Sequence, residues 1–111
     1  MEIRTRTEGD VTLMRLSGHL DGTTVEDLKT EVSAIQTGGG SRICLSCQRV
    51  EFIDSTALGQ LLAMHKKLKT GGGELVISEP SRFLQSAIRT LELYHILEIF
   101  DSDKDAIAHF A

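Results

Sequence analysis

Two cysteines are the first candidates for a chemical function in this chain, because of their residue type and their spacing. Cys44 and Cys47 have the Cys-x-x-Cys spacing of a redox pair or of half a zinc site. They lie in an apolar run over residues 43–47, which is typical of a buried strand, where side chains three positions apart face opposite ways. We therefore interpret both thiols as small buried hydrophobic groups. Four histidines show no ligand-like spacing, so we predict no metal and no cofactor: His19, His65, His95 and His109.

Three polar residues, Asp54, Ser55 and Thr56, form the second candidate group, because they stand at the start of a helical pattern. A serine at a helix start can offer its oxygen to exposed N–H groups, and the helix dipole favours a phosphate there by about 0.3 to 1 kcal/mol. A plain helix cap, with Asp54 as a first-turn anion, is the alternative interpretation. No histidine is placed to activate the Ser55 hydroxyl and no Gly-x-Ser-x-Gly motif is present, so the sequence does not predict an enzyme.

The composition limits the class of protein. The chain has 111 residues, of which 41% are hydrophobic and 25% charged, as expected for one globular domain over residues 1–111. No apolar run reaches the roughly 18 residues of a membrane helix, and the first residues lack the apolar core of a signal peptide, so we expect a cytoplasmic protein without membrane insertion. The net charge is -4 and the basic residues are scattered, which favours protein partners over nucleic acid.

Strand-like and helix-like patterns alternate along the chain. Residues 3–7 and 11–16 flank a turn-like Glu-Gly-Asp and predict an antiparallel hairpin. Further strands are predicted over residues 43–47, 75–77 and 96–100. The glycine-rich segments 37–41 and 70–74 each join a helix to the next strand, which indicates helix C-caps and not phosphate-binding loops. The order predicts an α/β fold with a mostly parallel sheet of about five strands and about four helices.

Local signals predict how each helix begins. Thr23 and Glu26 have the spacing of a capping box ahead of a first helix that runs to about Gln36. Pro80 suits the first turn of a third helix, and Ser102 caps a terminal helix. The second helix has a buried stripe at spacings of three and four: Leu58, Leu61, Leu62, His65 and Leu68.

The residues Asp54-Ser55-Thr56-Ala57-Leu58-Gly59 resemble the signature of the STAS family, the domain of sulfate transporters and anti-sigma factor antagonists, whose helix opens with Asp-Ser-Ser/Thr-Gly-Leu-Gly. The segment 16–21, which ends in His19-Leu20-Asp21, resembles the Gly-x-Leu-Asp segment of the same family. The order of elements is similar over the whole chain, and the length resembles that of the single-domain bacterial antagonists. The resemblance implies a STAS-like fold and a regulatory binding protein.

This resemblance also implies a mechanism. In such antagonists the residue after the motif aspartate, here Ser55, is phosphorylated by an anti-sigma factor that is also a serine kinase, and a PP2C-type phosphatase reverses the change. Thr56 is a second candidate acceptor. The unphosphorylated form binds the anti-sigma factor and so frees a sigma factor. We expect a local electrostatic switch, because a phosphate would add about -1.5 to -2 charges beside Asp54 and, if it lies close, Asp21. The expected partner-binding residues are Asp21, Asp54, Ser55, Thr56, Ala57, Leu58 and Gly59.

The sequence departs from the family pattern at two places. Ala57 stands where the family usually has glycine, and Ser46-Cys47 stands where it commonly has Asp-Leu. Because STAS domains also serve as scaffolds or as subunits of transport and signalling complexes, a role without a phosphorylation cycle is the alternative. A homo-oligomer is possible but is not indicated by the sequence.

Overall fold

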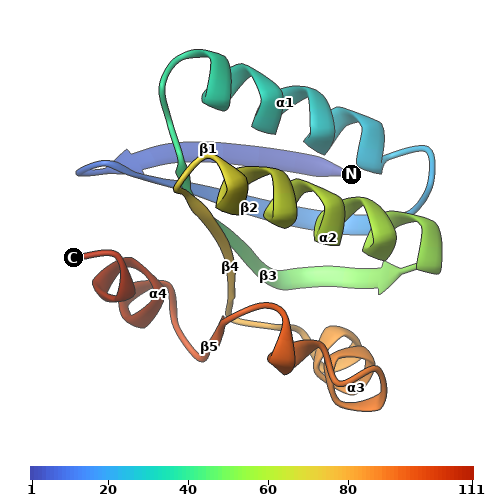
Figure 1. Ribbon diagram of the computed structural model, residues 1–111. Helices are drawn as coiled ribbons and strands as arrows, with labels where there is room; N and C mark the ends of the chain where they lie inside the picture. Colours follow the sequence, from blue (N-terminus) through green and yellow to red (C-terminus); the bar gives the residue numbers. More distant parts are fainter.

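A five-stranded mixed sheet forms the centre of the molecule in a computed structural model that describes residues 1–111 (Figure 1). The strands lie in the order of the sequence: β1 (Glu2–Glu8), β2 (Val11–Leu20), β3 (Arg42–Ile53), β4 (Glu74–Ser78) and β5 (Ile99–Phe100). The first two strands pair antiparallel as the predicted hairpin, and all the later pairs are parallel. The predicted α/β fold with a mostly parallel sheet of five strands and four helices is confirmed.

Four α-helices connect and cover these strands: α1 (Val25–Thr37), α2 (Ser55–Thr70), α3 (Arg82–Thr90) and α4 (Asp103–His109). Side chains of β2, β3 and β4 that point to one face form the main hydrophobic core with α1, α2 and α3. The alternate residues Leu13, Cys44 and Val76 point to the other face and pack with Ala106 of α4. The two cysteines therefore face opposite ways in the core, as predicted, and burial raises the pKa of the Cys44 thiol to about 11.

Both glycine-rich segments end helices, as predicted. Gly38 and Gly71 are the C-cap residues of α1 and α2, and the next glycines, Gly39 and Gly72, adopt positive φ angles of 94° and 85°. Gly73 donates its N–H to the Leu68 carbonyl at 2.8 Å, which is the long bond of a Schellman turn.

Several local predictions were wrong, each because a competing interaction was not visible in the sequence. The predicted Thr23–Glu26 capping box is absent, and Thr24, which makes no side-chain cap bond, precedes α1. Pro80 lies outside α3, whose N-cap is Ser81, because the Ser81 hydroxyl accepts the N–H of Leu84.

None of the helices combines the length and the apolar character that a membrane-spanning segment needs.

The last strand is much shorter than the predicted span of residues 96–100. A 3₁₀ turn over Leu93–His95 precedes it, and the N–H of Leu97 bonds back to the Leu93 carbonyl at 2.9 Å. Only Ile99 and Phe100 are then free to pair with β4. The helix that follows begins as predicted, with the Ser102 hydroxyl accepting the N–H of Asp105 at 3.1 Å.

The attachment of α4 to the sheet depends on a buried carboxylate, Asp103. Ser78 donates to it at 2.6 Å and Arg15 at 3.3 Å. Burial by itself raises the pKa of Asp103, but hydrogen bonds from Ser78, Ser46 and Arg15 outweigh that effect and hold the pKa below its ordinary value. The carboxylate therefore stabilises the fold above its unfolded-state pKa of about 3.9, and this contribution is lost as the pH falls through the lower folded-state pKa.

We predict that Asp103→Asn lowers the free energy of unfolding at pH 7 by about 1 to 3 kcal/mol, because it leaves charged hydrogen bonds unmade. Urea denaturation at pH 7 and at lower pH measures the effect, and the gap between variant and wild type should narrow below about pH 4. Asp105→Asn, an exposed change on the same helix, is the matched control. Equal destabilisation by both variants at pH 7 would contradict this role for Asp103.

Candidate functional site

The candidate site is formed where two loops meet at the carboxyl ends of β2 and β3. One loop, Asp21 to Thr24, leads from β2 into α1, and the other contains Asp54 between β3 and α2. Both lie on the right-hand side of the molecule in Figure 1, where α1 and α2 begin side by side. The structure therefore brings the predicted residues Asp21, Asp54 and Ser55 to the same end of the sheet.

Asp54 joins the two loops through its carboxylate. One oxygen accepts the N–H of Ala57 at 2.8 Å and thereby caps α2, while the other accepts the N–H of Gly22 at 3.2 Å. The Asp54 N–H in turn bonds to the carbonyl of Leu20 at 3.2 Å. The sequence allowed a plain helix cap at this position, and the structure shows that the capping side chain is Asp54 and not Ser55. A carboxylate is the stronger acceptor because it is charged.

The Asp21 loop is held by its own hydrogen bonds. One Asp21 oxygen accepts the N–H groups of Thr23 and Thr24, both at 2.9 Å, and the Thr24 hydroxyl donates to the His19 carbonyl at 2.7 Å. The backbone bonds from Thr24 and Thr23 are the main reason that the pKa of Asp21 lies below its ordinary value. Asp21 is thus an ionised carboxylate at neutral pH. The N–H of Glu26, which the Thr23 hydroxyl was predicted to cap, bonds instead to the Thr23 carbonyl at 3.3 Å.

Ser55 is the first residue of α2, and its side chain is exposed. The first turn of α2 contains no acidic residue, and Asp54 accounts for the N–H groups of Ala57 and Leu58. The N–H groups of Ser55 and Thr56 belong to the first turn, where a helix supplies no partner of its own, at the positive end of the helix dipole. This position leaves the Ser55 hydroxyl open to another protein and electrostatically suited to an attached phosphate.

Thr56 is also exposed but lies closer to the neighbouring loop. A Cβ placed on Gly22 would lie 3.2 Å from the Thr56 methyl carbon, so the loop backbone passes directly beside this side chain. Gly22 thus permits a contact between the two loops that a larger residue would disturb. The Ser55 side chain makes no such contact with Gly22, and this difference distinguishes the two candidate hydroxyls.

The remaining predicted contact residues divide into buried and exposed ones. Ala57 is fully buried and Leu58 is 9% exposed, so both side chains belong to the core. The methyl group of Ala57 therefore faces inward and does not obstruct an approaching surface. Gly59 is exposed one turn further along α2, with open space around its α-carbon.

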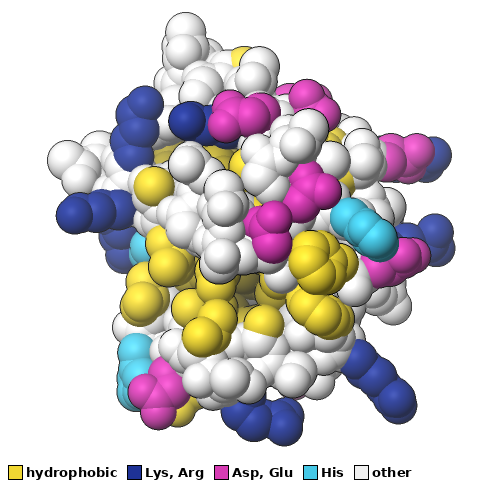
Figure 2. All heavy atoms as spheres, turned by 90° about the vertical axis from the view of Figure 1, so that its right-hand side faces the viewer, with side chains coloured by type: hydrophobic (Ala, Val, Ile, Leu, Met, Phe, Trp, Pro, Cys, Tyr) yellow, Lys and Arg dark blue, Asp and Glu magenta, His cyan; other side chains and the backbone are white.

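An aromatic pair beside the acidic loops was missed by the sequence analysis. Phe52 and Phe83 are 38% and 41% exposed, and their ring centroids lie 5.5 Å apart. His19 lies 5.8 Å from Phe52 between ring centroids. Figure 2, which views this end of the molecule, shows hydrophobic side chains gathered below acidic ones. No local sequence pattern marked this pair, because Phe52 belongs to β3 and Phe83 to α3 and only the fold brings them together.

The fold and this end of the sheet define an α/β domain with an exposed polar and aromatic surface. The chain belongs to the STAS domain family, whose model matches residues 2–106. It is 30% identical over 98 residues to the anti-sigma F factor antagonist of Paenibacillus polymyxa, with 87% of this chain and 84% of that protein covered.

Solved structures agree on the fold. The Bacillus cell fate determinant SpoIIAA in its phosphorylated form has a TM-score of 0.76 at 20% identity, with 99% of this chain and 100% of that chain covered. The anti-sigma factor antagonist SpoIIAA in its unphosphorylated form has a TM-score of 0.77 at 22% identity, with coverage of 98% and 97%. These structures confirm the predicted STAS-like fold, and the family model and the Paenibacillus relative confirm the predicted family resemblance.

We predict that Asp54→Ala lowers the free energy of unfolding by about 1 to 2 kcal/mol, because it removes the cap of α2 and the bond to Gly22. Asp54→Asn should cost less, since asparagine also caps helices well. Urea denaturation at neutral pH measures both variants. The control is Glu31→Ala, an exposed acidic residue within α1. An Asp54→Ala variant as stable as wild type would show that the carboxylate does not fix the loops.

Proposed function

We propose that this chain is a phosphorylation-controlled antagonist of an anti-sigma factor and that Ser55 is the phosphorylated residue. The observation that carries the proposal is the exposed Ser55 at the first position of α2, directly after Asp54, whose carboxylate accepts the N–H of Gly22 in the neighbouring loop. The anti-sigma F factor antagonist of Paenibacillus polymyxa supports it as a relative. The partner would be an anti-sigma factor with serine kinase activity, a PP2C-type phosphatase would reset the switch, and the cytoplasm is the corresponding location.

The charge of the site explains how phosphorylation would act. A phosphate on Ser55 adds about -1.5 to -2 charges next to Asp54 and on the same end of the sheet as the ionised Asp21. A partner surface that fits a neutral hydroxyl would then meet a dianion among carboxylates. A penalty of about 3 kcal/mol is enough to weaken binding roughly a hundredfold. The helix N-terminus favours the phosphate, so the fold does not need to change.

Ser55 is a better acceptor than Thr56 for a structural reason. The Thr56 side chain lies beside Gly22, so the neighbouring loop limits the room around the Thr56 hydroxyl. The Asp54 bond to Gly22 holds the loop in that position. Asp54 thereby has two roles in the proposal, as a charge that a partner reads and as the residue that holds Ser55 in place.

We predict that Ser55→Asp binds the candidate anti-sigma kinase at least about a hundredfold more weakly than wild type, whereas Ser55→Ala binds within a few-fold of it. Titration calorimetry with the kinase measures both. After incubation with the kinase and ATP, mass spectrometry should find one phosphate on wild type and on Thr56→Ala, and none on Ser55→Ala.

Ser33→Asp is the matched control, because Ser33 is an exposed serine in the second half of α1. The proposal fails if Ser55→Asp binds as tightly as wild type and no phosphate is found on Ser55 or Thr56. In that case a role without phosphorylation, as a scaffold or a subunit of a transport or signalling complex, would replace it.

The Phe52 and Phe83 pair would supply apolar binding energy to the same partner. Exposed aromatic residues next to a polar site are typical of the central contacts of protein interfaces. We predict that Phe83→Ala weakens kinase binding by about tenfold or more, while phosphorylation of Ser55 in excess kinase still occurs. Tyr94→Ala, which removes an aromatic side chain that is 54% exposed on the 3₁₀ turn, is the control. Equal affinities for Phe83→Ala and wild type would exclude the aromatic pair from the interface.

A further inference from the structure

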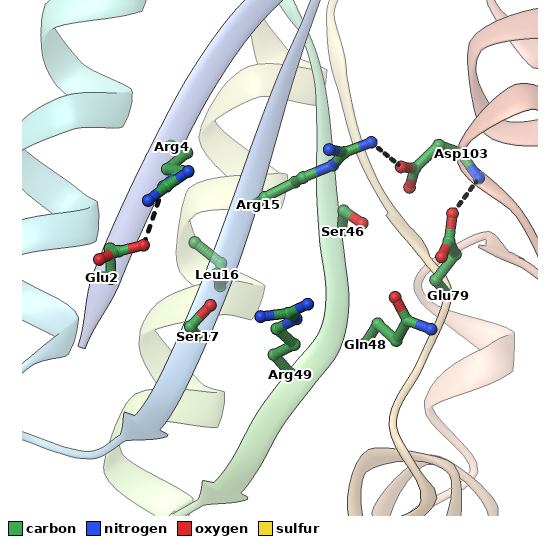
Figure 3. Close-up of a pocket in the computed structure, with 10 residues that line it drawn as sticks. All are labelled: Glu2, Arg4, Arg15, Leu16, Ser17, Ser46, Gln48, Arg49, Glu79 and Asp103. Atoms are coloured by element: carbon green, nitrogen blue, oxygen red, sulfur yellow. Dashed lines mark hydrogen bonds and ion pairs between the residues drawn. The ribbon is translucent and has the colours of Figure 1, made fainter.

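The sheet face opposite α1 and α2 contains a polar cavity of about 350 Å³ that the proposed switch does not use (Figure 3). It lies beside α4, which covers this face only around Leu13, Cys44 and Val76. Ten residues line the cavity, and Leu16 is the one hydrophobic residue among them. The rest of this face is therefore not a continuation of the core but a surface open to a polar ligand.

Strand register places three arginines on this face. Arg4 of β1 pairs directly with Arg15 of β2, and one row further Ser17 of β2 pairs with Arg49 of β3. A shift in register after Arg15, where β3 has an extra residue, brings Arg49 to the same face of the sheet. Like charges directly opposite each other destabilise an antiparallel pair. The arrangement costs stability unless an anion compensates for it.

Three carboxylates, those of Glu2, Glu79 and Asp103, equal the three arginines of the cavity in number, but only Glu2 and Asp103 form ion pairs with them. Glu2 pairs with Arg4 at 2.9 Å, but both side chains are mostly exposed, so this pair is weak. Asp103 pairs with Arg15 through a single nitrogen at 3.3 Å. Arg49 has no ion-pair partner among the salt bridges of the chain, and Figure 3 shows its guanidinium group at the cavity between β2 and β3. Several N–H donors of the three arginines are therefore free.

We propose that this cavity binds a phosphate group, with Arg49 as the principal contact and Arg4 and Arg15 as further donors. Guanidinium groups bind phosphate through paired N–H bonds, and donors on three adjacent strands suit a tetrahedral anion better than a planar carboxylate. Ser17 and Gln48 add an uncharged hydroxyl and an uncharged amide to the lining. The carboxylates of Glu2, Glu79 and Asp103 disfavour polyanions, so the ligand carries a single phosphate, either free or as a small phosphomonoester.

The test uses the intact chain and follows backbone ¹H–¹⁵N signals during titration with inorganic phosphate, with sodium chloride matched for ionic strength. We expect saturable shifts in residues 2–4, 15–17 and 46–49, and about tenfold weaker binding by Arg49→Gln. Because Arg49 makes no ion pair, the variant should keep the spectrum of a folded protein. Arg89→Gln, which removes an exposed arginine of α3 outside the cavity, should bind phosphate like wild type.

A second titration with O-phosphoserine distinguishes the two sources of phosphate. Tighter binding than for inorganic phosphate identifies a phosphomonoester, and equal or weaker binding identifies the free ion. The proposal is overturned if the shifts do not saturate, if chloride produces them equally, or if Arg89→Gln weakens binding as much as Arg49→Gln. The outcome of these titrations does not depend on the proposed phosphorylation of Ser55, because Ser55→Asp should leave phosphate binding in the cavity unchanged.

Discussion

The carboxylate of Asp54 is the interaction on which the geometry of the candidate site depends. It follows the end of β3, caps α2 through Ala57 and reaches across to Gly22 in the loop before α1. One side chain thus fixes the relative positions of a strand, two helix starts and a loop. Ser55 follows Asp54 directly in the chain, so the same rigid elements fix the position of the Ser55 hydroxyl.

The bond between Asp54 and Gly22 requires the two loops to pass close to each other, and small groups at their contact make this possible. Gly22 leaves room for the Thr56 methyl group, and the Asp21 carboxylate satisfies the N–H groups of its own turn. Two carboxylates therefore lie at one end of the sheet, each occupied by backbone donors. Their charges remain available to a partner even though their hydrogen-bonding capacity is partly used inside the molecule.

The alternation of strands and helices was predictable from the sequence because it depends on the spacing of apolar residues along short segments. The opposite orientation of Cys44 and Cys47 follows from strand geometry for the same reason. Helix caps were less predictable, because neighbouring polar residues offer several acceptors at each helix start. Asp54, and not Ser55, accepts the N–H of Ala57, and the backbone carbonyl of Thr23, not its hydroxyl, accepts the N–H of Glu26. The Phe52 and Phe83 pair and the row of arginines join residues from separate strands and helices, which no local pattern reveals.

The glycine turns at the ends of α1 and α2 have a practical consequence. Gly73 passes so close to the Ser41 carbonyl that there is no room for a Cβ at this position, so the two turns pack together at one end of the sheet. That end is about 24 Å from Ser55 along the axis of α2, and the carboxyl end of the chain lies on the same side (Figure 1). The candidate site and the carboxyl end of the chain therefore lie at opposite ends of the molecule, so a protein immobilised through its carboxyl end would present the candidate site to the solvent.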